Sequence, residues 1–251
     1  MSTDDVTLAA IADAGAVLDT LAGFAQTIDF SASVAAATNT AGAVDLSRVA
    51  GLSILDAIAA AQSDLAQLVA VPANLASSLV AVIQSFSGTS VDFRAISDSA
   101  ASVAWASQIP AAGIGGAQIL ANRAALANLM ATQGLIEAVR AATTATYDSQ
   151  DAALAIRDDL ADRLDSAITA TASRPLRALL DRMRVALVAD INTRAAALDS
   201  LATFTPAQVL PALVLAQRLY DDPTMAADIC ARNAVAHPGF VPAAPLTVLA
   251  P

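Results

Sequence analysis

The chain has 251 residues, of which 56% are hydrophobic but only 4% are aromatic, so any core must be built mainly from alanine and aliphatic side chains. Acidic residues outnumber basic ones by 23 to 13, the formal net charge is −10, and every basic residue is an arginine. Because affinity for nucleic acids depends on neutralising phosphates, this balance argues against direct nucleic-acid binding. Cys230 is the only cysteine, which excludes an intramolecular disulfide and a thiolate metal cage.

The first 72 residues carry helical patterns separated by a polar stretch. Ile11, Leu18 and Ala25 are spaced seven apart, which predicts a helix over residues 6–30 that packs along one seam. Residues 31–42 are small and polar and favour a loop, and Asp45 or Ser47 would cap a second helix that ends or kinks at Pro72. Asp4 and Asp5 stand where a secretory signal carries basic residues, so we expect no signal peptide.

Two runs without charged residues, 65–91 and 99–122, are long enough to cross a bilayer. Both contain proline and several amide or hydroxyl side chains, and alanine is only weakly apolar on insertion scales. We therefore expect helices buried against copies of the same chain rather than membrane spans. The glycines of 113–116 lack the spacing and the lysine of a phosphate-binding loop and predict a joint between helices.

A helix is expected over residues 123–146, and the most amphipathic stretch follows from Ser149. Its apolar residues fall four apart on one stripe, while its aspartates face away from that stripe. A straight helix holds such carboxylates on a convex surface and cannot wrap them around a cation, so we expect a solvated acidic face. The stripe is Ile156, Leu160, Leu164 and Ile168, and the acidic face is Asp158, Asp159, Asp162 and Asp165.

A further helix is predicted from Ser173 or Arg174 as the cap, with Pro175 in the first turn and a leucine-rich stripe that reaches residue 201. Asp190 and Arg194 lie four residues apart on or beside that stripe. They fit an ordinary pair within one helix. They also fit a polar contact that fixes the register against a neighbouring subunit.

The last fifty residues have turn signals specific enough to predict a small module. Residues 203–205 alternate as a short strand, a helix begins near Pro211, and Asp222 with Pro223 ends it and starts another. Asn233 lies near the end of the second helix, and residues 245–249 alternate as a closing strand. The predicted order is strand, helix, helix, strand.

That order, with Tyr220 before the second helix, Asn233 within it and Phe-Val-Pro at 240–242, resembles the LysM module. The Gly-Asp-Thr that usually follows the first strand of sugar-binding members has no counterpart in residues 206–208, so the resemblance does not carry over glycan binding. Residues 145–251 are also similar to the C-terminal part of the Mu-like bacteriophage DNA circulation (circularisation) proteins, which are tail and baseplate components. The residues that carry this second resemblance are 147–149, 151–152, 157–158, 175–179, 185–190, 210–216, 218–220, 231–233 and 237–242. The β-rich N-terminal domain of that family is not expected here, as in a shortened or split member.

The chain lacks the usual constellations of catalytic residues. His237 is the only histidine, and it stands in a turn before Pro238. An active site that needs two histidines therefore cannot form within this sequence. Cys230 fits a buried small apolar residue better than a nucleophile. We expect no enzymatic activity, no cofactor and no metal.

The expected fold is mainly α, with long alanine-rich helices in a bundle over residues 1–199 and a C-terminal β-α-α-β, LysM-like docking module over residues 200–251. The resemblance implies a structural component of a phage tail or baseplate, a hub or tube-adaptor protein of the virion. Its partners would be copies of itself and neighbouring tail proteins, with no direct nucleic-acid binding and no membrane. A phasin-like helical coat protein and a glycan-binding LysM protein are the alternatives. The candidate protein-interface residues are Asp190, Arg194, Arg218, Tyr220, Arg232, Asn233, His237 and Phe240.

Overall fold

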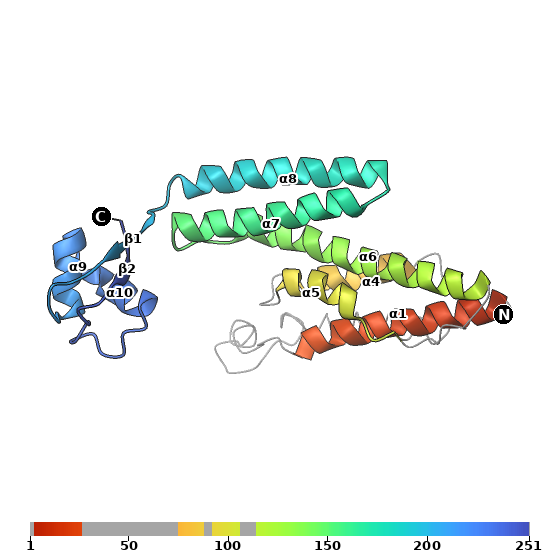
Figure 1. Ribbon diagram of the computed structural model, residues 1–251, viewed down its shortest axis with the longest axis horizontal. Helices are drawn as coiled ribbons and strands as arrows, with labels where there is room; N and C mark the ends of the chain where they lie inside the picture. The colour runs from red at the N-terminus through yellow and green to blue at the C-terminus, as the bar shows by residue number, and fades with distance from the viewer. Residues whose placement is uncertain (1–2, 27–74, 88–91, 106–113, 251) are drawn as a thin grey trace, which may run out of the picture. The chain divides into compact units, whose positions relative to one another are not determined.

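The computed structural model describes residues 3–26, 75–87, 92–105 and 114–250 (Figure 1). The described part is mainly helical and has a small antiparallel sheet near its C-terminal end, which confirms the expected fold class. The chain divides into two compact units, residues 1–142 and 143–251. Each unit is described by itself.

The described part of the first unit consists of helices of different lengths. They are α1 (Thr3–Gln26), α4 (Leu75–Ser85), α5 (Phe93–Ser99), the 3-10 helix η2 (Ala100–Ser102) and α6 (Ile114–Thr144), whose last residues lie beyond the unit boundary. The predicted first helix is confirmed over residues 6–26, and the rest of its expected range, 27–30, lies outside the described residues. Its seam residue Leu18 is fully buried, as is Leu21, together with Ile96 and Met130 from other helices and Phe86 in the turn after α4.

Two features show how closely α6 packs in this unit. The Arg123 Nε atom lies 2.9 Å from the Oδ2 atom of Asp13 on α1, and both side chains are largely shielded from solvent. A Cβ atom added to Gly134 would lie 2.9 Å from the backbone nitrogen of Ser97, so α5 crosses α6 at backbone contact distance. The second unit contains no comparable buried ion pair among its described residues.

The helices α7 (Gln150–Ala170) and α8 (Arg174–Ala195) form an antiparallel hairpin in the second unit (Figure 1). The predicted cap at Ser173 is confirmed, since its side chain accepts a hydrogen bond from the backbone of Leu176. Ser149, where the amphipathic stretch is expected to begin, caps α7 in the same way by accepting a hydrogen bond from the backbone of Ala152. The inner stripe buries Leu160, Leu164, Leu180, Leu187 and Ile191. The hairpin is thus held together by one apolar seam, and the opposite side of each helix faces solvent.

The terminal module has the predicted order of elements, which is strand, helix, helix, strand. β1 (Leu201–Phe204) pairs antiparallel with β2 (Leu246–Leu249), so that Leu201 faces Leu249 and Phe204 faces Leu246. Between the strands lie α9 (Ala212–Tyr220), the 3-10 helix η3 (Pro223–Met225) and α10 (Ala226–Arg232). Their buried residues form one small core: Ala212, Leu215, Ala216, Ile229, Val241, Leu246 and Val248.

The end of α10 is closed by its own backbone and by a side chain. Ala234 has a φ of 49°, and the amides of Ala234 and Val235 donate back to Ala231 and Cys230, which is a Schellman ending with alanine in the left-handed position. Asn233 lies at the end of this helix, as expected, with a φ of −106°, and it hydrogen-bonds through its side chain. Its Nδ2 donates to the carbonyl oxygens of Ile229 and Thr247, and its Oδ1 accepts from the Thr247 amide at 2.7 Å.

Several hydrogen bonds join the module to the base of the hairpin. Leu201 N donates to the Oδ2 atom of Asp151, and Gln150 N donates to the carbonyl oxygen of Asp199 at 2.9 Å. Arg232 Nη2 donates to the carbonyl oxygen of Asp148 at 3.0 Å. The domain boundary expected at 199/200 therefore falls inside the second unit, whose boundary lies at 142/143.

Several expectations for the first half fall wholly or partly outside the described residues. The expected loop at 31–42 and the helix that would end at Pro72 lie there, as do parts of both charge-free runs. A joint between helices is expected at residues 113–116, but residues 114–116 are helical, because α6 already begins at Ile114. Within the described residues, the helical segment Asp5–Gln26 is the one that is long and apolar enough to span a bilayer, and 44% of its most apolar window is buried in the protein.

Candidate docking surface

Two connections of the terminal module, residues 205–211 and 233–245, are held together by backbone hydrogen bonds. Leu210 and Val241 form an isolated antiparallel bridge, with N···O distances of 3.3 and 2.9 Å. Ala212 N donates to the carbonyl oxygen of Pro238 at 2.7 Å. The start of α9 is therefore fixed against the loop that precedes β2.

The bridge directs apolar side chains outward, because successive residues of extended backbone point to opposite sides. Val241 is buried in the module core, whereas Phe240 beside it is 70% exposed. Val209 is 54% exposed, and Leu213 in the first turn of α9 is 61% exposed. We call the following set the exposed apolar face: Val209, Leu213, His237 and Phe240.

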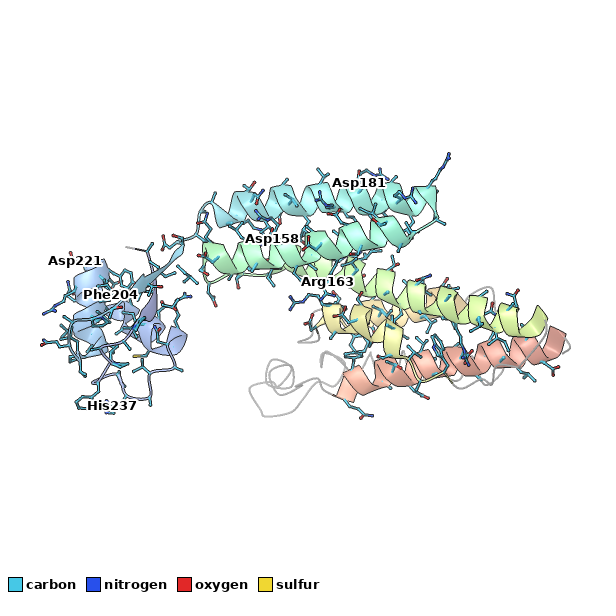
Figure 2. The ribbon with its side chains drawn as sticks, in the orientation of Figure 1. Asp158, Arg163, Asp181, Phe204, Asp221 and His237 are labelled. Atoms are coloured by element: carbon cyan, nitrogen blue, oxygen red, sulfur yellow. The ribbon has the colours of Figure 1, made fainter. Side chains whose placement is uncertain are left out.

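The two rings of this face are held by one turn. Phe240 N donates to the carbonyl oxygen of His237, and Gly239 N donates to the His237 Nδ1 atom at 3.1 Å. The ring centroids of His237 and Phe240 lie 5.2 Å apart with a tilt of 42°. Figure 2 shows His237 and Asp221 at opposite ends of the module. The loop thus presents a fixed pair of rings to solvent.

The exposed apolar face is free of formal charge. Residues 200–217 and 233–251 contain no aspartate, glutamate, lysine or arginine. The charged residues of the module lie in residues 218–232, on α9, α10 and the corner between them. Exposed apolar side chains on segments that carry no charge are typical of protein contacts rather than of a solvated surface.

Three of the candidate interface residues stabilise the module itself. Tyr220 Oη donates to the carbonyl oxygen of Leu249 at 3.0 Å, and burial raises the pKa of this phenol. Arg232 forms an ion pair with Asp228 at 2.7 Å, and the hydrogen bond that its guanidinium donates to the Asp228 carboxylate raises the pKa of Arg232. Asn233 connects α10 to β2 as described above. Their contacts within the chain explain why these residues are needed for the fold.

Asp190 and Arg194 form the pair within α8 that their spacing predicts, at 2.7 Å. Arg194 also donates to the carbonyl oxygen of Ala145 at 2.9 Å and lies 5.2 Å from the centroid of the Tyr147 ring. These contacts anchor the segment that leads into α7. They give Arg194 a role within the unit.

The remaining candidates, Arg218, His237 and Phe240, are exposed. The structure brings His237 and Phe240 together, while Arg218 belongs to the charged part of the module. The sequence analysis missed Val209 and Leu213, because a valine and a leucine beside a predicted helix fit a core equally well. Leu213 directly follows Ala212, which is buried in the module core. Val209 precedes Leu210, which pairs with Val241, and these positions place both side chains outside.

Neither the side-chain clusters nor the known proteins point to a chemical activity. In the part of the chain that the structure describes, no group of three or more His, Cys, Asp or Glu side chains could hold a metal ion. No protein-family model matches the chain, and no curated protein matches it. The most distinctive surface feature of the module is the exposed apolar face.

Proposed function

We propose that the protein is a structural component of a bacteriophage tail or baseplate, and that the exposed apolar face of its terminal module docks onto a neighbouring tail protein. The observation that carries the proposal is the fixed pair of rings at His237 and Phe240, flanked by Val209 and Leu213. Aromatic anchors without charge are typical of the centre of protein interfaces. The resemblance of residues 145–251 to phage circulation proteins supplies the class of partner.

The location of the chain is tested first. Virions from the phage that encodes it are purified, and the chain is located by mass spectrometry and by electron microscopy with a label fused to the terminal module. We expect a fixed number of copies per tail or baseplate. Intact virions that contain the chain at no tail position would refute the proposal.

The role of the face is tested by substitution. Phe240→Asp places a charge at the most exposed ring, so tails should fail to assemble or lose the neighbouring protein. Leu120→Asp is the matched control, because Leu120 is exposed by 51% but lies on α6 in the other unit. Normal tails with Phe240→Asp would show that the docking face lies elsewhere.

A phasin-like coat protein is a second candidate, because the apolar helix α1 carries the exposed side chain of Leu8. Such a protein would bind an apolar granule through its helices. Deletion of residues 201–251 separates the two functions, since a coat protein would still bind granules whereas a tail protein would fail to assemble. A glycan-binding function, the third possibility, would be supported by retention of the chain on peptidoglycan.

A further inference from the structure

The solvent side of α7 is acidic, whereas the solvent side of α8 carries three exposed arginines and one exposed aspartate, Asp181. On α7 the aspartates follow one exposed line, and the side chains of Asp158 and Asp165 are 64% and 51% exposed. On α8 the exposed residues include arginines and apolar side chains. The acidic line is Asp151, Asp158, Asp162 and Asp165, and the exposed set on α8 includes Arg174, Arg177, Leu179, Arg182 and Val185.

These charges are only partly neutralised within the hairpin. Arg184 pairs with Asp165 across the two helices at 2.6 Å, and Arg157 pairs with Asp158. Arg177 and Arg182 instead donate to backbone carbonyl oxygens, of Thr171 and Ala178 respectively. Among the described residues, no ion pair engages Asp162 or Arg182. Complementary charges are therefore available on two different surfaces of the same unit.

The register of the hairpin places these charges at similar heights. The cross-helix contacts Arg157–Asn192 and Arg184–Asp165 show which residues of α7 and α8 lie opposite each other. By that register, Arg182 lies level with the last two turns of α7, near Asp165 and Asp162. A second hairpin placed alongside in the same orientation would bring its α7 next to this α8, with Asp162 within reach of Arg182.

We infer that the arginine side of α8 binds the aspartate side of α7 in a second copy of this chain. The contact is head-to-tail, because each copy uses two different surfaces, so repetition generates a ring or a filament. This inference deepens the self-assembly that forms part of the proposed function. It does not depend on the exposed apolar face, which lies in the terminal module.

Contacts between exposed charges are weak individually and are screened by salt. We therefore expect association that is measurable at about 0.05 M salt and lost at about 1 M, where the screening length falls to about 3 Å. On a tail, neighbouring subunits would hold the copies at a high effective concentration and strengthen the same contact.

The test is sedimentation velocity of the full chain over a range of concentrations at low salt. The wild-type chain should form oligomers, and Arg182→Glu and Asp162→Arg should each weaken association about tenfold or more. An equimolar mixture of the two variants should associate again. A contact between two different variants joins opposite charges at positions 182 and 162, whereas a contact between two copies of the same variant joins like charges and is repelled. Arg218→Glu, which makes the same charge change in the terminal module, should associate like the wild type.

Two results would overturn the inference. One is a wild-type chain that stays monomeric at low salt, and the other is a mixture that associates no better than its separate variants. Circular dichroism shows whether each variant is folded, and recovery in the mixture could not come from misfolded chains. Phe240→Asp should leave this association unchanged, so failure of the docking proposal and failure of this inference give different results.

Discussion

The first unit and the terminal module bury polar groups in different ways. In the first unit, the carboxylate of Asp13 is removed from solvent and matched by the guanidinium of Arg123, which comes from a helix more than a hundred residues away in the chain. In the module, the groups that need partners are mostly backbone atoms. Asn233, Tyr220 and Asp222 satisfy them through neutral or exposed side chains.

This difference sets how each region responds to substitution. Removing one member of a buried ion pair leaves an uncompensated charge, which typically costs about 3–5 kcal/mol. Leaving a buried backbone group without its partner costs about 1–3 kcal/mol. The first unit should therefore be the more sensitive region to changes of single polar side chains, and the module should tolerate them better.

The largest effect is expected for Arg123→Met, which keeps most of the side-chain volume but removes the charge beside Asp13. We expect a loss of about 3–5 kcal/mol of stability in the first unit. Hydrogen exchange followed by mass spectrometry should show faster exchange in α1 and α6. Adding Asp13→Asn should restore part of the loss, and a double variant as unstable as Arg123→Met would contradict the explanation.

Gly134→Ala tests close packing rather than charge in the same unit. The new methyl group would press on the backbone of Ser97 and Phe93, so α5 must shift, at a cost of about 1–3 kcal/mol. Gly15→Ala is the control, because nothing lies within 4 Å of the added atom, and it should stabilise α1 by about 0.5–1 kcal/mol. Equal effects in thermal unfolding would show that α5 and α6 are less closely packed than described.

Asn233→Ala tests the polar connections of the module. It removes the side-chain hydrogen bonds to Ile229 and Thr247, and we expect a loss of about 1–2 kcal/mol. The amide of Thr247 should exchange faster by nuclear magnetic resonance, whereas α7 and α8 should be little affected. Gln208→Ala, on an exposed turn, is the control, and a similar effect from it would remove the special role of Asn233.

Ala234→Gly should act in the opposite direction. Ala234 adopts a left-handed conformation in the Schellman ending of α10, where glycine avoids the clash of the Cβ atom. We expect a gain of up to about 1 kcal/mol in the free energy of unfolding, measured in urea. A loss of stability would show that the turn does not hold this conformation in solution.

The smallest effect concerns Asp222 and acid. Hydrogen bonds from the Thr224 hydroxyl and amide hold the pKa of this carboxyl below its ordinary value of 3.8. Because the folded state lowers this pKa, the contribution is present above the ordinary value and is lost as the pH falls through the lowered one. The Thr224 amide signal should follow this titration, and Asp222→Ala should abolish it without a general loss of structure.

The sequence predicted the module better than the first unit, for a physical reason. Asp222, Pro223 and the alternation before Leu249 act on their own neighbours, so local chemistry indicates each start and stop. The contact of Asp13 with Arg123 and the approach of Gly134 to Ser97 join distant parts of the chain, and no local pattern indicates them. The outward position of Val209 also follows from tertiary pairing, through the bridge between Leu210 and Val241.

The hydrogen bonds between the hairpin base and the module have a mechanical consequence. A pull on β2 passes through β1 to the contact of Leu201 with Asp151, and a pull on α10 passes through Arg232 to the carbonyl of Asp148. Both routes end at the start of α7, whereas the chain itself connects β1 to α8. We therefore expect a force applied to the module to act on both helices of the hairpin.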